Sequence, residues 1–325
     1  MRKLLLSWAF VGTALGLGIW ATVALEYDQN KVVLYYLMPY FALCMALQYL
    51  WPDRPNRFEK GEILTDVLNN AALLGLTALQ GSLVYWMASA GSGLLFQWGW
   101  LDDSLAARNL PFWAQVIVAW WAFDFMFYVT HRIAHEVDFF WRFHSVHHSA
   151  ARLSFLNASR VHPVDITWRR LVPLFVAYQT GASPEAIIVA NTIGAVLAVI
   201  THMNVDFRFG PLNYVFGSNE IHRWHHSNKI DEARNFSVLM IWDHLFGTFV
   251  YPKDRTHPER LGLFNELYYP RHHFWGQLWI PFAWKRWKAR QAMAAQAEGN
   301  QPSVVAARAP SSGGDAVEEP SQHAV

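Results

Sequence analysis

The chain has 325 residues, of which 53% are apolar, 16% are aromatic and only 16% are charged, and its formal net charge is +1. The charged share lies well below the roughly 25% of an ordinary soluble protein, which favours a membrane protein, and the near-zero net charge gives no general attraction to nucleic acid. The single cysteine, Cys44, excludes an internal disulfide framework and any zinc or iron–sulfur site built from cysteines.

Several stretches are long and apolar enough to cross a bilayer, which takes about 20 residues of helix. They cover 4–25, 32–51, about 63–90 and 111–130. The first follows Met1-Arg2-Lys3, as a signal peptide would, but a second span follows at once, so we expect a retained helix. Two shorter apolar stretches, 171–180 and 185–201, predict a helical hairpin that need not cross fully. The expected fold is therefore an all-α membrane bundle of about four transmembrane helices plus this hairpin.

The basic residues of the loops predict the orientation of the bundle. Arg2 and Lys3 precede the first span, and the 52–62 loop carries three more basic residues, whereas the 26–31 and 91–110 loops carry one each. Basic loops stay in the cytoplasm, so four crossings place residue 131 and its successors in a helical cap on the cytoplasmic side. We expect a multi-pass protein, of a bacterial inner membrane to judge by the alanine-rich carboxyl end.

The composition changes near the end of the chain. From about 293 it is rich in Ala, Ser, Pro and Gly and has no aromatic residue, which predicts a disordered tail over 293–325. Residues 272–290 mix Trp and Phe with Lys and Arg, as a segment lying in the membrane interface does. We therefore expect one membrane-embedded domain, 1–292, followed by the tail.

Three groups of histidines carry the chemistry: "HRIAH" (131–135), "HSVHH" (144–148) and "HRWHH" (222–226). Residues three and four apart share one face of a helix, so each group is expected to project its imidazoles toward a single point. Neutral imidazole suits iron, zinc and copper. Eight ligands exceed the capacity of one four-coordinate ion, which predicts two metal ions held by His131, His135, His144, His147, His148, His222, His225 and His226.

These motifs resemble the fatty acid hydroxylase/sterol desaturase superfamily of integral-membrane di-iron enzymes, over roughly residues 115–252. The three histidine groups match its HxxxH, HxxHH and HxxHH boxes, and "LNASRVHPVD" (156–165) and "NFSVLMIWDHLFGT" (235–248) match the flanks. The resemblance implies that the eight box histidines bind two irons, that O₂ is the co-substrate and that a lipid carbon is hydroxylated or desaturated. Hydroxylation is the better expectation, because it is widespread in the family.

Other polar residues near the boxes are weaker candidates. Some members of the superfamily add a histidine from the region of His202, so its ligation stays open, whereas His162 is expected to hold a loop or the substrate entrance. A ligating histidine usually donates its other N–H to a carboxylate or carbonyl. Asp124 lies two turns before His131 on the same helix face and is the first candidate for this role, ahead of Asp165 and Asp243.

Electrons have to come from a separate protein, because the sequence has no nucleotide-binding, haem or iron–sulfur motif of its own. We expect a ferredoxin- or cytochrome-type donor with its reductase. Two other functions remain open: a zinc-dependent membrane hydrolase, which would leave several histidines surplus, and a metal transporter, which would place its ligands near the middle of the membrane. The identity of the lipid is not predicted.

Overall fold

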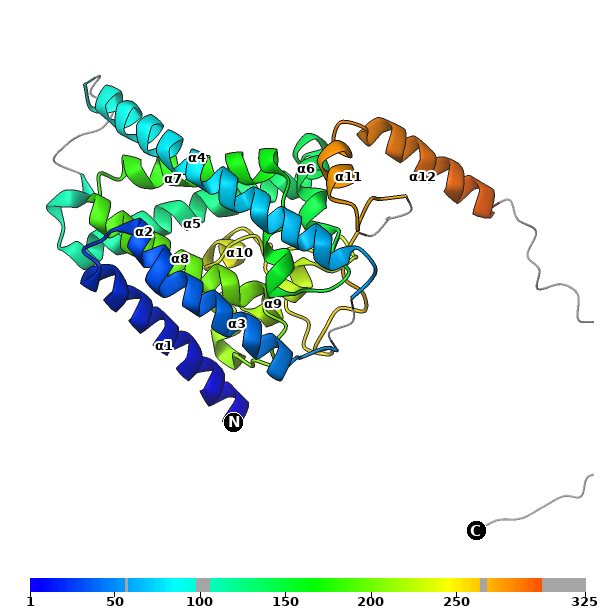
Figure 1. Cartoon of the computed structure of the whole chain (residues 1–325), viewed down its shortest axis with the longest axis horizontal. Coiled ribbons are helices and arrows are strands. Elements are labelled where there is room, and N and C mark those ends of the chain that lie inside the picture. Colours follow the sequence, from blue (N-terminus) through cyan, green and yellow to red (C-terminus); the bar gives the residue numbers. More distant parts are fainter. Residues whose placement is uncertain (56–57, 98–105, 264–267, 300–325) are drawn as a thin grey trace, which may run out of the picture.

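The protein is described by a computed structural model (Figure 1) that covers residues 1–55, 58–97, 106–263 and 268–299, without some side chains of two helices. The described residues form helices and loops, with three isolated β-bridges and no β-strand among them. The predicted all-α class is confirmed. The longer helices are α1 (Arg2–Ala24), α3 (Met38–Leu50), α4 (Glu62–Gln97), α5 (Phe112–Glu136), α7 (Pro163–Gln179) and α8 (Pro184–His202).

Four helical stretches of the described residues are long and apolar enough to cross a membrane: Arg2–Ala24, Gln29–Leu50, Phe112–Glu136 and Pro184–His202. The second joins α2 (Gln29–Val32), a π-helical turn (Val33–Leu37) and α3 into one rod. Three of the four coincide with predicted spans, and the fourth is α8, for which we expected only half of a short hairpin. The span predicted at 63–90 lies in α4, where many side chains from 77 onward are outside the described residues.

Helix α8 is the innermost of the four. Its apolar window is 56% buried, whereas the windows of the other three are 22–28% buried. It packs against α1 and α5. Its residue Val196 and the residue that follows it, Met203, are fully buried in a cluster with Cys44, which is also fully buried. Because α8 is apolar on all sides, it suits a position between other helices, while the outer three present apolar faces to the bilayer.

The ends of several helices meet where α8 ends. Lys3 at the start of α1 pairs with Asp206, which follows α8, and Pro52 forms a β-bridge with Val205. The amino end, the loop after α3 and the end of α8 therefore lie at the same end of the bundle, as the distribution of basic residues predicted. Which side of the membrane this end faces stays a prediction.

Three short helices follow the long ones in the chain: α6 (Asp138–His148), α9 (Asn219–His225) and α10 (Ile241–Leu245). Helix α6 carries the histidines of the second box, and α9 carries His222 and His225 of the third. Beyond them, α11 (Phe274–Trp279) leads to α12 (Trp284–Gly299), whose Trp284 and Trp287 pack with Val146 of α6. Figure 1 shows α12 extending away from the bundle. The tail predicted to begin at 293 therefore starts inside a helix, and residues 300–325 lie outside the described ones.

Candidate metal centre

Nine histidines converge at the end of the bundle and form two groups. The five-histidine group consists of His131, His135, His144, His148 and His225, and the four-histidine group consists of His147, His202, His222 and His226. Within each group, one ring nitrogen of every member lies within 4.8 Å of the others. The groups adjoin, since the rings of His148 and His226 stack with their centroids 4.4 Å apart. The eight box histidines therefore come together as predicted, and His202 joins them.

The division between the groups differs from the sequence prediction that each box points at a single point. The pair His144 and His148 stays together, but His147 turns to the other group, and in the third box His225 separates from His222 and His226. Successive residues of an α-helix are rotated by about 100°, whereas residues four apart nearly superimpose. Each consecutive His-His pair must therefore serve two sites, and the second and third boxes each contribute to both groups.

The hydrogen bonds of His131 and His144 fix which ring nitrogen carries the proton. Nδ1 of His131 lies 2.8 Å from the carbonyl oxygen of Phe236, and Nδ1 of His144 lies 3.0 Å from Oδ2 of Asp165. Both acceptors are oxygens, so both Nδ1 atoms donate and both Nε2 atoms are bare in the neutral rings. These two Nε2 atoms face each other at 3.2 Å. Two lone pairs at that distance repel unless a cation lies between or beside them.

Other ring nitrogens are buried without partners, which is costly for a polar atom. Nδ1 of His225 donates to the carbonyl oxygen of Arg234 at 2.8 Å, so its Nε2 is also bare. Among the described residues, no hydrogen-bond partner exists for this Nε2 or for Nε2 of His135 and His148. In the four-histidine group, Nε2 of His222 lies 2.8 Å from Nε2 of His202 and 3.1 Å from Nε2 of His226. Bare, buried imidazole nitrogens directed at common centres are the donor set that iron or zinc requires, so the residues fit a pair of such ions.

The electrostatics of the site keep these rings neutral. Burial, reinforced by neighbouring histidines, lowers the pKa of His144, His147, His148, His222 and His226 well below 6.5, and Arg169 adds to this effect at His144 and His147. Burial lowers the pKa of His225 to about 3. The charged imidazolium is therefore disfavoured at neutral pH, and the neutral form is the one that binds a metal ion.

Asp165 is the carboxylate that directly orients a ring. It is fully buried and accepts from His144, while its two oxygens also accept from Nε and Nη2 of Arg169 at 3.0 and 2.9 Å. Sequence reasoning proposed Asp165 for this role but missed Arg169, which lies one helical turn further along α7. The spacing of four between Asp165 and Arg169 was the available signal.

Asp124 and Asp243 hold the backbone near the site and touch no imidazole. The oxygens of Asp124 accept from the backbone N–H groups of Val238 and Leu239, each at 3.0 Å. Asp243 accepts from the N–H of Phe236 at 2.8 Å. The carbonyl oxygen of Phe236 accepts a hydrogen bond from Nδ1–H of His131. By holding the 236–239 backbone in place, both carboxylates therefore help to orient the ring of His131. The expected direct contact with a histidine is therefore absent for both, because each carboxylate is occupied by backbone donors.

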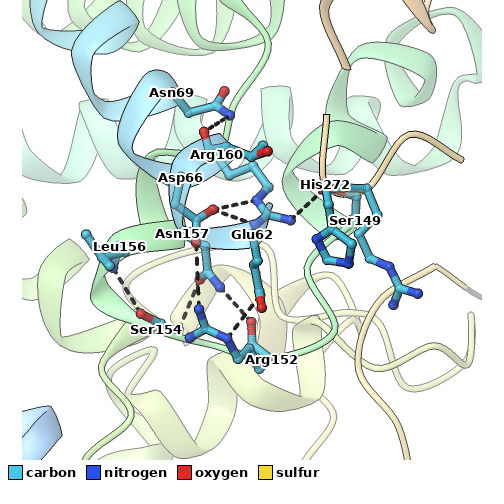
Figure 2. A network of polar contacts seen from close by, with 12 residues as sticks. Glu62, Asp66, Asn69, Ser149, Arg152, Ser154, Leu156, Asn157, Arg160 and His272 are labelled. Carbon is cyan, nitrogen blue, oxygen red and sulfur yellow. Dashed lines mark hydrogen bonds and ion pairs between the residues drawn. The ribbon is translucent and has the colours of Figure 1, made fainter. Parts of the chain in front are cut away.

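A second buried network of hydrogen bonds and ion pairs connects the four-histidine group to side chains of α4 (Figure 2). The carbonyl oxygen of Arg160 accepts from Nδ1 of His147 at 3.3 Å. The guanidinium of Arg160 is fully buried and donates to Asp66 through Nε at 2.8 Å and through Nη2 at 2.5 Å. Beside it, Nε of Arg152 lies 3.0 Å from Glu62. Nothing local in the sequence pointed to Arg160 as the partner of Asp66.

Two histidines near the boxes belong to neither group. His162 caps α7, accepting from the N–H of Val164 at 3.1 Å and donating to the carbonyl of Leu278 at 3.2 Å. His244 donates to the carbonyl of Tyr214 at 3.1 Å. Both roles are structural, and the expectation that His162 holds a loop agrees with its position.

Comparison with known proteins gives a family for the region that contains both groups. Residues 116–248 match the family model described as fatty acid hydroxylase. The chain is 38% identical over 144 residues to the ornithine lipid hydroxylase OlsE of Rhizobium tropici, a match that covers 44% of each chain. It is 31% identical over 160 residues to the alkylglycerol monooxygenase of Caenorhabditis elegans, covering 47% of this chain and 31% of that protein.

The human alkylglycerol monooxygenase is 30% identical over 168 residues, which cover 49% of this chain and 36% of that protein. The matched part thus spans less than half the length of each of these relatives. No solved structure matches the chain.

Proposed function

We propose that the protein is a membrane-bound oxygenase that hydroxylates a C–H position of a lipid with O₂ and external electrons, and the match of residues 116–248 to the fatty acid hydroxylase family model supports this. The two histidine groups hold two iron ions in this proposal, with the eight box histidines and His202 as ligands. Removal of two hydrogens instead of insertion of oxygen, which is desaturation, starts from the same hydrogen abstraction and is the related alternative.

The observation that best supports the two metal ions is that the Nε2 atoms of His131 and His144 face each other at 3.2 Å. Each ring has its proton committed to an oxygen acceptor on the far side, so the facing lone pairs repel unless a metal ion binds both or one ring takes up a second proton, which burial disfavours. When bound, two irons supply the activation of O₂ that an unactivated C–H bond needs. The chain supplies the orientation, because Asp165 and the backbone carbonyls of Phe236, Arg160 and Arg234 fix the tautomer and direction of four rings. Seven of the nine histidines are buried and His135 and His222 are partly buried, which limits the access of water to the site.

The position of the groups suits a lipid substrate. His131 and His135 lie in the last turns of α5, and His202 is the last residue of α8, so the ligands lie where candidate spans end. An apolar pocket of about 40 Å³ is lined by Val11 of α1 and by Leu197 and Ile200 of α8, one turn from His202. In this proposal a hydrocarbon chain approaches the histidines from the bilayer side, past these residues. A transporter would place its ligands nearer the middle of its spans.

The electron donor approaches from the other side in this proposal. Ligands at the ends of spans are within reach of the aqueous phase, which the basic loops predict to be the cytoplasm. A ferredoxin- or cytochrome-type protein with its reductase would deliver the electrons there.

The proposal predicts a lipid product that depends on the histidines. The lipids of a strain that lacks the gene are compared with those of the same strain complemented by the wild type or by His147→Ala. We expect one lipid species heavier by a single oxygen atom (or lighter by two hydrogens) only with the wild type, and label from ¹⁸O₂ in the hydroxylated species. Identical lipid profiles in the three strains, or a cleaved lipid without oxygen insertion, would contradict it.

A further inference from the structure

A polar cleft of about 260 Å³ lies beside the four-histidine group, and the proposed reaction makes no use of it. This volume is many times the space that one water molecule needs. The residues that line it come from the loop after α3, the segment after α6, the end of α8, α9 and the 257–261 segment. The charged or titratable ones are Arg54, Arg152, Arg223, Arg260, His257 and Glu259.

The lining carries four arginines and one carboxylate, Glu259. It therefore keeps more positive than negative charge, although Arg152 pairs with Glu62 and Arg223 pairs with Asp53. Asp53, which is buried beside the cleft, pairs with Arg223 and with Nε2 of His257. Glu259, the one carboxylate of the lining, lies 3.1 Å from Nζ of Lys229. Arg54 and Arg260 lie at exposed positions of the lining. Arginines converging on a polar cavity are the usual means of binding a phosphate or carboxylate.

The cleft lies at the level where two candidate spans end. Arg54 follows the end of α3 at Leu50 by four residues, and Asn204 follows the end of α8 at His202 by two. The two are joined, since the N–H of Arg54 donates to Oδ1 of Asn204 at 3.1 Å and Nδ2 of Asn204 donates to the carbonyl of Arg54 at 2.8 Å. Trp51, which directly follows α3, is 68% exposed, and tryptophan is enriched at membrane interfaces. If α3 and α8 span the membrane, the cleft lies near the level of the lipid headgroups.

Two segments lead from the apolar pocket past the four-histidine group to the cleft. At the end of α8, Ile200 lines the apolar pocket, His202 belongs to the group and Asn204 lines the cleft. The segment of α9 shows the same order: Ser218, just before the helix, lines the apolar pocket, His222 belongs to the four-histidine group and Arg223 lines the cleft. A molecule with an apolar chain and an anionic head would therefore find its apolar and charged sites on either side of the histidines.

We propose that this cleft binds the anionic phosphate or carboxylate of a lipid headgroup. The assignment of that lipid as the substrate rests on the proposed function, whereas the binding itself does not. In this arrangement the arginines set how far the lipid enters the site, and so determine which carbon lies next to the four-histidine group.

The experiment uses the full chain in nanodiscs of phosphatidylcholine that contain a minor fraction of phosphatidylglycerol. Native mass spectrometry of the released protein counts the retained lipids. We expect the wild type to retain phosphatidylglycerol in preference to phosphatidylcholine by about tenfold, which corresponds to about 1.4 kcal/mol. Arg54→Gln/Arg260→Gln should lose this preference. Lys31→Gln, which removes a charge from the loop between the first two spans, is the matched control and should keep it.

Two further measurements separate the explanations. The metal content of every variant should equal that of the wild type, which shows that the histidine site is intact. Inorganic phosphate titrated into protein in neutral detergent tests for a free-anion site. Equal retention of phosphatidylglycerol by the wild type and the double variant would overturn the proposal, and so would phosphate binding without any lipid preference. A protein that retains phosphatidylglycerol but oxidises no lipid would support the cleft and contradict the proposed function.

Discussion

Replacing His147 and His226 together by alanine is expected to remove one of two irons and to reduce lipid oxidation at least about 100-fold. Both side chains belong to the four-histidine group, so the double variant leaves that site two nitrogens while the five-histidine group keeps all of its own. Changes to residues that merely support metal ligands already cost about 10- to 100-fold, and the loss of two ligands should cost more. Iron quantification of the purified protein and the lipid assay check the two effects.

The matched control is His162→Ala/His244→Ala. It also removes two imidazoles, but both of these donate to backbone carbonyls outside the two groups. This variant should keep two irons, even if it loses some thermal stability. A His147→Ala/His226→Ala protein with the iron content of the wild type would show that these side chains are not ligands.

The second large effect is expected for Asp165→Asn. The substitution removes the charge that holds Nδ1–H of His144 and that balances Arg169, and both Asp165 and Arg169 are buried. An uncompensated buried charge costs about 3–5 kcal/mol, so the melting temperature in detergent should fall sharply. Iron affinity or activity should fall by about 10- to 100-fold as well, because the ring loses its anionic acceptor.

Glu136→Gln provides the comparison, because Glu136 pairs with Arg132 at the same spacing of four but on the surface. An exposed pair of this kind contributes about 0.2–1 kcal/mol, so iron content and activity should stay near the wild type. If both variants behaved alike, Asp165 would have no special role. The double variant Asp165→Asn/Arg169→Gln should recover stability more than activity, since it removes the stranded charge but not the need of His144 for an acceptor.

Much of the site could be predicted from the sequence because its signals are local. The boxes place imidazoles on single helices at spacings of three and four, and their convergence follows once the helices adjoin. The division of His147 from His148, and of His225 from His226, follows from the same helical geometry, although we expected each box to act as a unit. His202 was recognisable from its place at the end of an apolar helix, but only its position beside His222 puts it in the four-histidine group.

The supporting contacts were less predictable because they join residues far apart in the chain. Asp66 meets Arg160 across 94 residues, and Asp124 meets Val238 across 114. Nothing local distinguishes such a carboxylate from a solvated one, so Asp124 was assigned to a ring when its partners are backbone N–H groups. The fold shows the same limit: α8 was expected to be half of a short hairpin, and its central position depends on packing by α1 and α5, which periodicity does not reveal.

Metal analysis of the purified wild-type protein, combined with Mössbauer spectroscopy after growth on ⁵⁷Fe, tests the central claim most directly. The account predicts two irons per chain in nitrogen-rich environments, distinguishable because five histidines surround one centre and four surround the other. A single zinc ion per chain, or iron bound equally well after His147 and His226 are removed, would contradict it.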